Sequence, residues 1–186
     1  NIALPSLRID SFSVDVKKRV QDIKKSSLTF AAEAGSQRLR NVINKGLTED
    51  MIREGAMKAF QGGWNKVKFY FMVGLPTETE EDLKAIPELC EQLAVDYYTI
   101  PKEERIGKVS ITASSSFFVP KPFTPFQWAS MNTEEEFLEK AHFVKDHFFR
   151  QKNRKSLSYR YHDADLTIME GIFARGDRKL APAILQ

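Results

Sequence analysis

The chain has 186 residues, of which 42% are hydrophobic and 28% charged, which is typical of a globular protein large enough for one domain with its own core. Its 28 basic and 25 acidic residues leave a net charge of +3, too small to indicate nucleic-acid binding by itself. The single cysteine, Cys90, excludes an internal disulfide and a cysteine-ligated metal centre made by this chain alone, and it favours a cytoplasmic location. No apolar run approaches the roughly 18 residues of a membrane span.

Apolar spacing in the first third of the chain alternates between the periods of strands and helices. It predicts the end of a strand at 6–9, a helix over 15–23, a strand over 27–32 and a helix over 36–43. A stronger helix is predicted over 48–61, because Thr48 is a favourable N-cap and acidic residues occupy the first turn. The two glycines that follow residue 61 are typical of a helix end.

The clearest strand is predicted over 66–73, and a Gly-Leu-Pro sequence ends it. A helix then begins after Thr79, where Asp82 completes a variant of the capping box. The apolar stripe of this helix includes Cys90, which we expect in the core. Pro87 lies inside the stripe, and we expect it to kink the helix or to end its first segment.

The last third of the chain continues the alternation. It predicts a strand over 108–119, a loop rich in proline and phenylalanine over 120–127, a helix over 133–149 with a capping box at its start, a short strand over 156–161 and a helix around 166–173. Strands that alternate with helices of 10 to 20 residues indicate βαβ units and a parallel sheet. A complete eight-unit barrel needs roughly 200 to 250 residues. The predicted fold is therefore α/β, a partial (β/α) barrel fragment whose parallel strands are flanked by helices.

In parallel α/β folds, ligands bind at the carboxyl ends of the strands. Two predicted turns lie there, residues 33–36 and 74–79, and each leads into a helix whose free N–H groups suit a polar or anionic ligand. From the pattern alone, 74–79 is more typical of an ordinary strand-to-helix turn. Glu33 ends an apolar strand, and the sequence leaves open whether its carboxylate contacts a ligand.

Four segments resemble radical S-adenosylmethionine enzymes, and they occur in the order of that family. Residues 6–10, 28–40 and 71–82 resemble the third, fourth and fifth strand segments, and residues 118–128 resemble the loop after the sixth strand. The resemblance is closest to members with an N-terminal cobalamin-binding domain. It covers roughly residues 1–150, which we expect to be the carboxyl half of the partial barrel, with 151–186 as an extension.

The resemblance implies a set of contacts with S-adenosylmethionine. Glu33 would bond the ribose or another polar part of the cofactor, with Ser36 beside it, and Lys45 would pair with the methionine carboxylate. Arg8 matches a position that contacts the amino or carboxylate end of the methionine.

The fifth and sixth strand segments carry the remaining contacts that the resemblance implies. Tyr70 and Met72 would face the nucleoside, although Tyr70 replaces an acidic residue found in some relatives. The segment 114–118, with Ser116 at its centre, would lie near the adenine.

The family's three-cysteine motif and its Gly-Gly-Glu segment are absent from this chain. We expect both upstream of Asn1, so the 4Fe–4S cluster would be ligated there and the chain alone would be inactive. The parent enzyme would cleave S-adenosylmethionine to methionine and a 5′-deoxyadenosyl radical, with cobalamin in a separate domain. The sequence does not indicate the substrate, for which RNA and protein both stay open. A half-barrel leaves an unpaired strand edge and an apolar face, so we expect the isolated chain to self-associate or to be only marginally stable.

Other features have alternative interpretations. The basic segment 150–155 fits either a non-catalytic RNA-binding module or, more simply, a solvated linker. His142 and His147 lie about 140° apart on a helix, which does not favour a metal pair. His162 and Asp163 fit either an acid–base couple or a helix N-cap. The aromatic loop 117–128 fits either a substrate wall or a plug at the edge of the barrel.

Overall fold

The computed structural model describes residues 27–185, which form one four-stranded sheet flanked by helices. The strands are β1 (Leu28–Glu33), β2 (Lys66–Val73), β3 (Ser110–Phe117) and β4 (Leu157–Tyr161), and they lie in that order. All three strand pairs are parallel. This confirms the predicted α/β class and is consistent with a partial barrel. Arg8 and the elements predicted at 6–9 and 15–23 lie outside the described residues.

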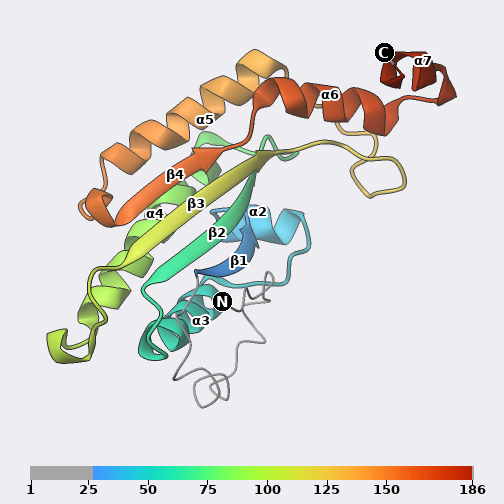
Figure 1. The fold of residues 1–186 in the computed structure, drawn as a ribbon. Coiled ribbons are helices and arrows are strands. Elements are labelled where there is room, and N and C mark those ends of the chain that lie inside the picture. The colour runs from blue at the N-terminus through green and yellow to red at the C-terminus, as the bar shows by residue number, and fades with distance from the viewer. Residues whose placement is uncertain (1–26, 186) are drawn as a thin grey trace.

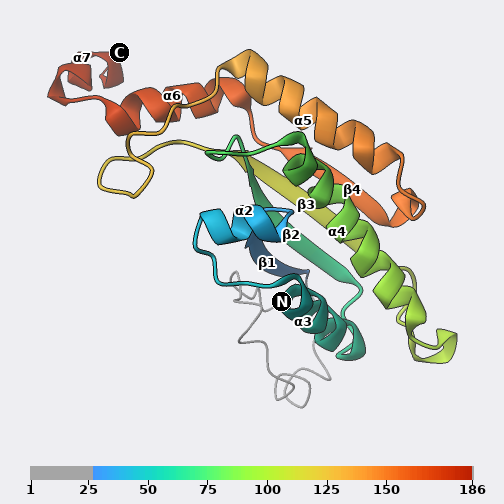
Figure 2. The ribbon, with the colours of Figure 1, turned by 180° about the vertical axis from the view of Figure 1, so that it is seen from behind.

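The helices between successive strands lie on one face of the sheet, and α6 and α7 follow β4 and extend beyond the end of the sheet (Figures 1 and 2). They are α2 (Gln37–Val42), α3 (Glu49–Gln61), α4 (Glu80–Thr99), α5 (Glu134–Phe149), α6 (Ala164–Arg175) and α7 (Ala181–Ile184). Short 3₁₀ turns occur at Lys102–Glu104, Arg154–Ser156 and Arg178–Leu180. No helix within residues 27–185 is long and apolar enough to cross a membrane.

Capping side chains set the helix starts where the sequence predicts them. The Thr48 hydroxyl accepts a hydrogen bond from the Met51 N–H at 3.2 Å, which begins α3. Capping boxes at Thr79 and Thr133 begin α4 and α5, and Asp163 caps α6. These bonds satisfy backbone donors that have no partner within the helix, and they depend on residues at most three positions away.

Pro87 neither interrupts nor ends α4, which runs without a break from Glu80 to Thr99. The expectation that it would end a first helical segment is therefore wrong. Proline removes one backbone hydrogen bond. Around it, Ile86, Leu89 and Cys90 are buried against the core, and this packing outweighs the missing bond.

The main core lies between the sheet and α3, α4 and α5. Along β2, Val67, Phe69, Phe71 and Val73 are buried toward the helices, while the intervening residues are partly exposed. Cys90 is fully buried in this core, as predicted. The opposite face of the sheet is not covered by any helix of residues 27–185 (Figure 1), and we call it the helix-free face.

A second, smaller apolar cluster lies beyond the carboxyl ends of the strands. It consists of Ala34, Leu39, Leu75 and Phe118, with Met72 packed against it. These residues come from the segments that follow β1, β2 and β3, apart from Leu39 in α2 and Met72 near the end of β2. The cluster therefore joins the turns in which the sequence predicts a ligand site.

Candidate functional site

Glu33 and Lys45 form an ion pair at the carboxyl end of β1. The Lys45 ammonium donates to Glu33 Oε1 at 3.0 Å, and the two side chains are 30% and 27% exposed, for lysine and glutamate respectively. Glu33 has a left-handed backbone, with φ of 68°, and the pairing of β1 with β2 shifts register between Ala31 and Glu33. Two residues that the resemblance assigns to different parts of one cofactor are thus brought together and stay accessible.

Ser36 is bound into a network centred on Asp82. Its hydroxyl accepts from the Leu39 N–H at 3.0 Å, which caps α2, and donates to the Asp82 carboxylate. The same carboxylate accepts from the Thr79 N–H at 2.8 Å and from the Arg38 guanidinium. Ser36 therefore ties the start of α2 to the start of α4, and its hydroxyl is already engaged by protein groups.

The Asp82 side chain is only 3% exposed. Burial by itself would raise the pKa of Asp82, but hydrogen bonds from Arg38, Ser36 and Thr79 hold the pKa well below its ordinary range. The carboxylate thus stays charged and fixes the relative position of the two turns.

The turn after β2 is closed by its own carboxylate. Both oxygens of Glu78 accept from the Gly74 N–H at 3.0 Å, and Lys140 of α5 donates to Glu78 Oε1 at 3.0 Å. The Glu78 side chain is 2% exposed. Burial raises the pKa of Glu78, and the opposing effects of Lys140 and the Gly74 and Leu75 N–H groups are smaller. The expectation that this turn offers free N–H groups is therefore wrong for Gly74.

Arg40 holds the turn after β1 from inside the protein. Its guanidinium is fully buried and donates to the carbonyl oxygens of Ala34 at 3.0 Å, Gly35 at 2.8 Å and Leu47 at 3.1 Å. The sequence identified Asp82 as part of the capping box at Thr79 but not as a partner of Ser36 or Arg38, and it did not indicate the roles of Arg40 and Glu78. The spacing within local motifs carries no signal of these further contacts.

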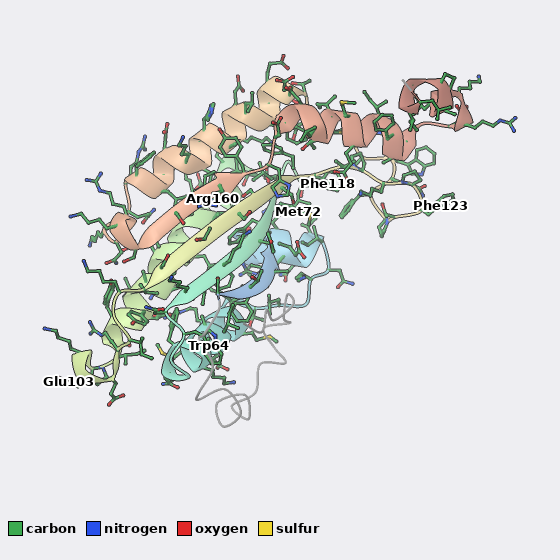
Figure 3. All side chains as sticks on the ribbon, viewed as in Figure 1. Trp64, Met72, Glu103, Phe118, Phe123 and Arg160 are labelled. Carbon is green, nitrogen blue, oxygen red and sulfur yellow. The ribbon has the colours of Figure 1, made fainter. Side chains whose placement is uncertain are left out.

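Tyr70, Met72 and Ser116 lie on the helix-free face, as β-strand alternation requires. Met72 pairs in register with Ser116, and Tyr70 pairs with Ser114 (Figure 3 labels Met72 near the end of β2). The Tyr70 hydroxyl accepts from Lys68 Nζ at 3.1 Å, and the same ammonium lies 4.4 Å from the Tyr70 ring centroid. Ser116 Oγ lies 3.5 Å from the Phe71 carbonyl oxygen. These side chains form one surface that ends beside the second apolar cluster.

The basic segment 150–155 lies at the other end of the sheet, in the turn that leads into the amino end of β4. Its four basic residues, at 150, 152, 154 and 155, are exposed. A cleft of about 380 Å³ lies next to it, lined in part by Phe149, Arg154 and Lys155. The segment is thus separated from the carboxyl-end site by the length of the strands.

The histidines take part in local contacts. His142 Nε2 lies 3.1 Å from the Tyr161 hydroxyl, and His147 Nδ1 lies 2.8 Å from the Phe143 carbonyl oxygen. Asp163 is the N-cap of α6, which agrees with the simpler interpretation of the His162–Asp163 pair.

The aromatic loop after β3 divides into two parts. Phe118 is buried in the second apolar cluster and its ring meets Phe126 edge-on, with centroids 6.0 Å apart. Phe123 and Trp128 are 98% and 87% exposed. Figure 3 labels Phe118 beside the sheet and Phe123 in the loop away from it. One part of the loop therefore seals the strand ends, while the other projects from them.

No family model matches the chain. It is similar to an uncharacterized protein of Methanocaldococcus jannaschii, with 33% identity over 181 residues that make up 97% of this chain and 36% of that protein. It is also similar to a protein of Pyrococcus horikoshii named an uncharacterized methyltransferase, with 27% identity over 92 residues that make up 50% of this chain and 20% of that protein. The chain thus spans only about a third or less of the length of these two relatives.

Proposed function

We propose that this chain is the S-adenosylmethionine-binding half of a radical S-adenosylmethionine enzyme. The full-length enzyme would cleave the cofactor to methionine and a 5′-deoxyadenosyl radical. The observation that carries the proposal is the accessible Glu33–Lys45 pair at the carboxyl end of β1, next to a helix-free face that ends in an apolar cluster. The edge at which parallel strands end is where α/β folds bind their ligands.

The chemistry of these groups suits the parts of S-adenosylmethionine. Glu33 supplies acceptor oxygens for ribose hydroxyls, and Lys45 supplies a positive charge for the methionine carboxylate. Met72, which is partly exposed and packs against the buried Leu75–Phe118 cluster, offers an apolar contact for the adenine, with the Ser116 hydroxyl nearby. Ser36, held by Asp82 and the α2 N-terminus, would act by keeping the turn after β1 in place.

This chain does not provide ligands for the 4Fe–4S cluster. Its one cysteine, Cys90, is fully buried in the main core, and burial raises the pKa of its thiol, which disfavours the thiolate that iron requires. The cluster ligands would therefore come from outside the chain. A cobalamin-binding domain would also lie outside it.

The similarity of half the chain to a protein named a methyltransferase supports an enzymatic role that involves methyl groups. S-adenosylmethionine carries a transferable methyl group as well as the adenosyl group, so this similarity and the proposed radical cleavage converge on one cofactor. Methyl transfer through cobalamin is the form of the reaction that would unite both.

The proposal is tested with the full-length protein, reconstituted with iron and sulfide without oxygen and treated with a chemical reductant. We expect 5′-deoxyadenosine from S-adenosylmethionine, and much less from the Glu33→Gln variant. No product from a cluster-loaded protein would refute the proposal. RNA binding that is lost when Arg150, Lys152 and Arg154 are replaced by Gln, without formation of 5′-deoxyadenosine, would instead favour the RNA-binding module.

A further inference from the structure

The middle of the helix-free face carries cations and hydroxyl groups but no carboxylate. Two rows of paired residues cross β2, β3 and β4: Lys68, Thr112 and Ser158 form the first, and Tyr70, Ser114 and Arg160 form the second. We infer that these rows bind a phosphate group, which under the proposed function belongs to the substrate. The site shares Tyr70 and Ser114 with the segments that the resemblance assigns to the nucleoside, and it does not include Glu33 or Lys45.

Strand alternation places these side chains on one surface. In β2 and β4 the residues that point toward the helices alternate with Lys68, Tyr70, Ser158 and Arg160. Neighbouring strands are about 4.8 Å apart, so each row spans roughly 10 Å. Figure 3 labels Arg160 on β4, and its long side chain can reach the row of hydroxyls beside it.

Apart from Glu33 at the carboxyl end of β1, the charged strand residues on this face are all basic. Within residues 27–185 they are Lys66, Lys68 and Arg160. Glu33, at that end, is paired with Lys45. All six residues of the two rows carry hydrogen-bond donors. A surface of this composition attracts an anion and repels a cation.

Ser114 and Arg160 face the same side of the sheet and offer donors to one ligand. Ser114 is 5% exposed as a residue, but its hydroxyl is not among the buried polar atoms without a partner, so it stays accessible from this face. Arg160, its neighbour across β3 and β4, is exposed and has no ion pair within residues 27–185. A bound oxyanion would accept hydrogen bonds from both groups at once.

The number and spread of the donors favour phosphate over carboxylate. A carboxylate has two oxygens in one plane, whereas a phosphate monoester presents three oxygens in a tetrahedral arrangement. Arg160 can donate two parallel hydrogen bonds to one pair of oxygens, and Ser114 and Thr112 lie on the strand next to it. Lys68, held by the Tyr70 hydroxyl, adds a positive charge from the other side.

The test uses the full-length protein and measures binding of inorganic phosphate, pyrophosphate and acetate by calorimetry, with no cluster or reductant needed. We expect phosphate to bind more tightly than acetate and to be weakened by salt. Arg160→Gln should weaken phosphate binding about tenfold, Arg160→Lys less, and Ser114→Ala a few-fold. Arg150→Gln, which removes the same charge at the far end of the sheet, should have no effect.

Several results would overturn the inference. The first is equal binding of acetate and phosphate, and the second is equal effects of Arg160→Gln and Arg150→Gln. The third is displacement of phosphate by S-adenosylmethionine, because it would assign the donors to the cofactor carboxylate. If Arg160→Gln fails to fold, Arg160→Lys and Ser114→Ala decide the matter. A protein that binds phosphate in this way but forms no 5′-deoxyadenosine would refute the proposed function and leave this site in place.

Discussion

The Lys45 ammonium donates to Glu33 Oε1 across 3.0 Å at the carboxyl end of β1. The two residues are joined by the turn after β1, by α2 and by the residues that follow it, so the chain returns to its own strand end. The buried Arg40 guanidinium binds the carbonyl oxygens of Ala34 and Gly35 at the start of this path and of Leu47 just after it. The position of the pair thus depends on a buried cation that does not touch it.

Replacing either member of this pair should weaken cofactor binding. We expect Glu33→Gln and Lys45→Met each to lower the affinity of the full-length protein for S-adenosylmethionine about tenfold, because each removes one charged hydrogen-bonding group. The exposed Lys84–Glu81 pair on α4 is a matched control, since its atoms are 2.9 Å apart and neither residue is assigned a contact with the cofactor. Calorimetry on all variants checks the prediction, and a similar loss in Lys84→Met would contradict it.

A substitution at Glu33 can also distinguish its effect on the stability of the protein from its effect on cofactor binding. Its φ of 68° is a left-handed conformation that favours glycine. Glu33→Gly should therefore keep the free energy of unfolding or raise it by up to about 1 kcal/mol, while cofactor affinity falls as in Glu33→Gln. Urea denaturation followed by calorimetry on the same sample tests both parts. Lost stability with unchanged affinity would show that Glu33 serves the fold alone.

Asp82 should make stability depend on pH in the acid range. Its pKa is lower in the folded protein than the ordinary value of about 4, so its stabilising effect is complete above that value and is lost as the pH falls toward the folded pKa. Asp82→Asn should cost about 2 kcal/mol at pH 7, because the bond from Arg38 loses its charged acceptor. The difference from the unaltered protein should shrink between about pH 4 and pH 2. A difference that stays constant over this range would count against the role of Asp82.

Removal of Lys140 from the Glu78–Lys140 pair should leave a protein whose stability rises as the pH falls, which is the opposite of the effect of Asp82. Lys140→Met leaves the buried Glu78 carboxylate without its cation and should destabilise the protein by about 3 kcal/mol at pH 7. The pKa of Glu78 is already raised by burial, so the folded protein binds this proton more tightly than the unfolded chain does. Lowering the pH should therefore recover part of the loss in Lys140→Met but not in the Glu78→Gln variant. Urea titrations at pH 5 and pH 7.5 make the comparison.

Gly35 should not tolerate a side chain. A Cβ at this position would lie 2.7 Å from the Ala85 carbonyl carbon and would also meet the Ile86 nitrogen, both in the backbone of α4. Gly35→Ala should then cost about 2 kcal/mol or more, because α4 would have to move. Gly171→Ala is a useful comparison, since the atoms closest to its Cβ belong to the flexible Met131 side chain. In thermal unfolding, the Tm of Gly35→Ala should be well below the Tm of Gly171→Ala.

The sequence by itself determined the strands, the helix starts and the parallel α/β class. These depend on residues close together in the chain: the alternation along β2, the Thr48 cap three residues before Met51, and the capping box of Thr133 and Glu136. Pro87 is the exception, because its local effect on the helix was outweighed by packing against the core.

Tertiary structure alone decided which charged groups meet. Arg38 binds Asp82, which lies 44 residues away in the sequence, and Lys140 binds Glu78, which lies 62 residues away. No local motif specifies either partner. The alignment of Ser114 with Arg160 depends on the register of β3 with β4. Register and helix docking arise from the packing of the whole core, so sequence patterns could indicate the strand ends where a site would form but not the contacts within it.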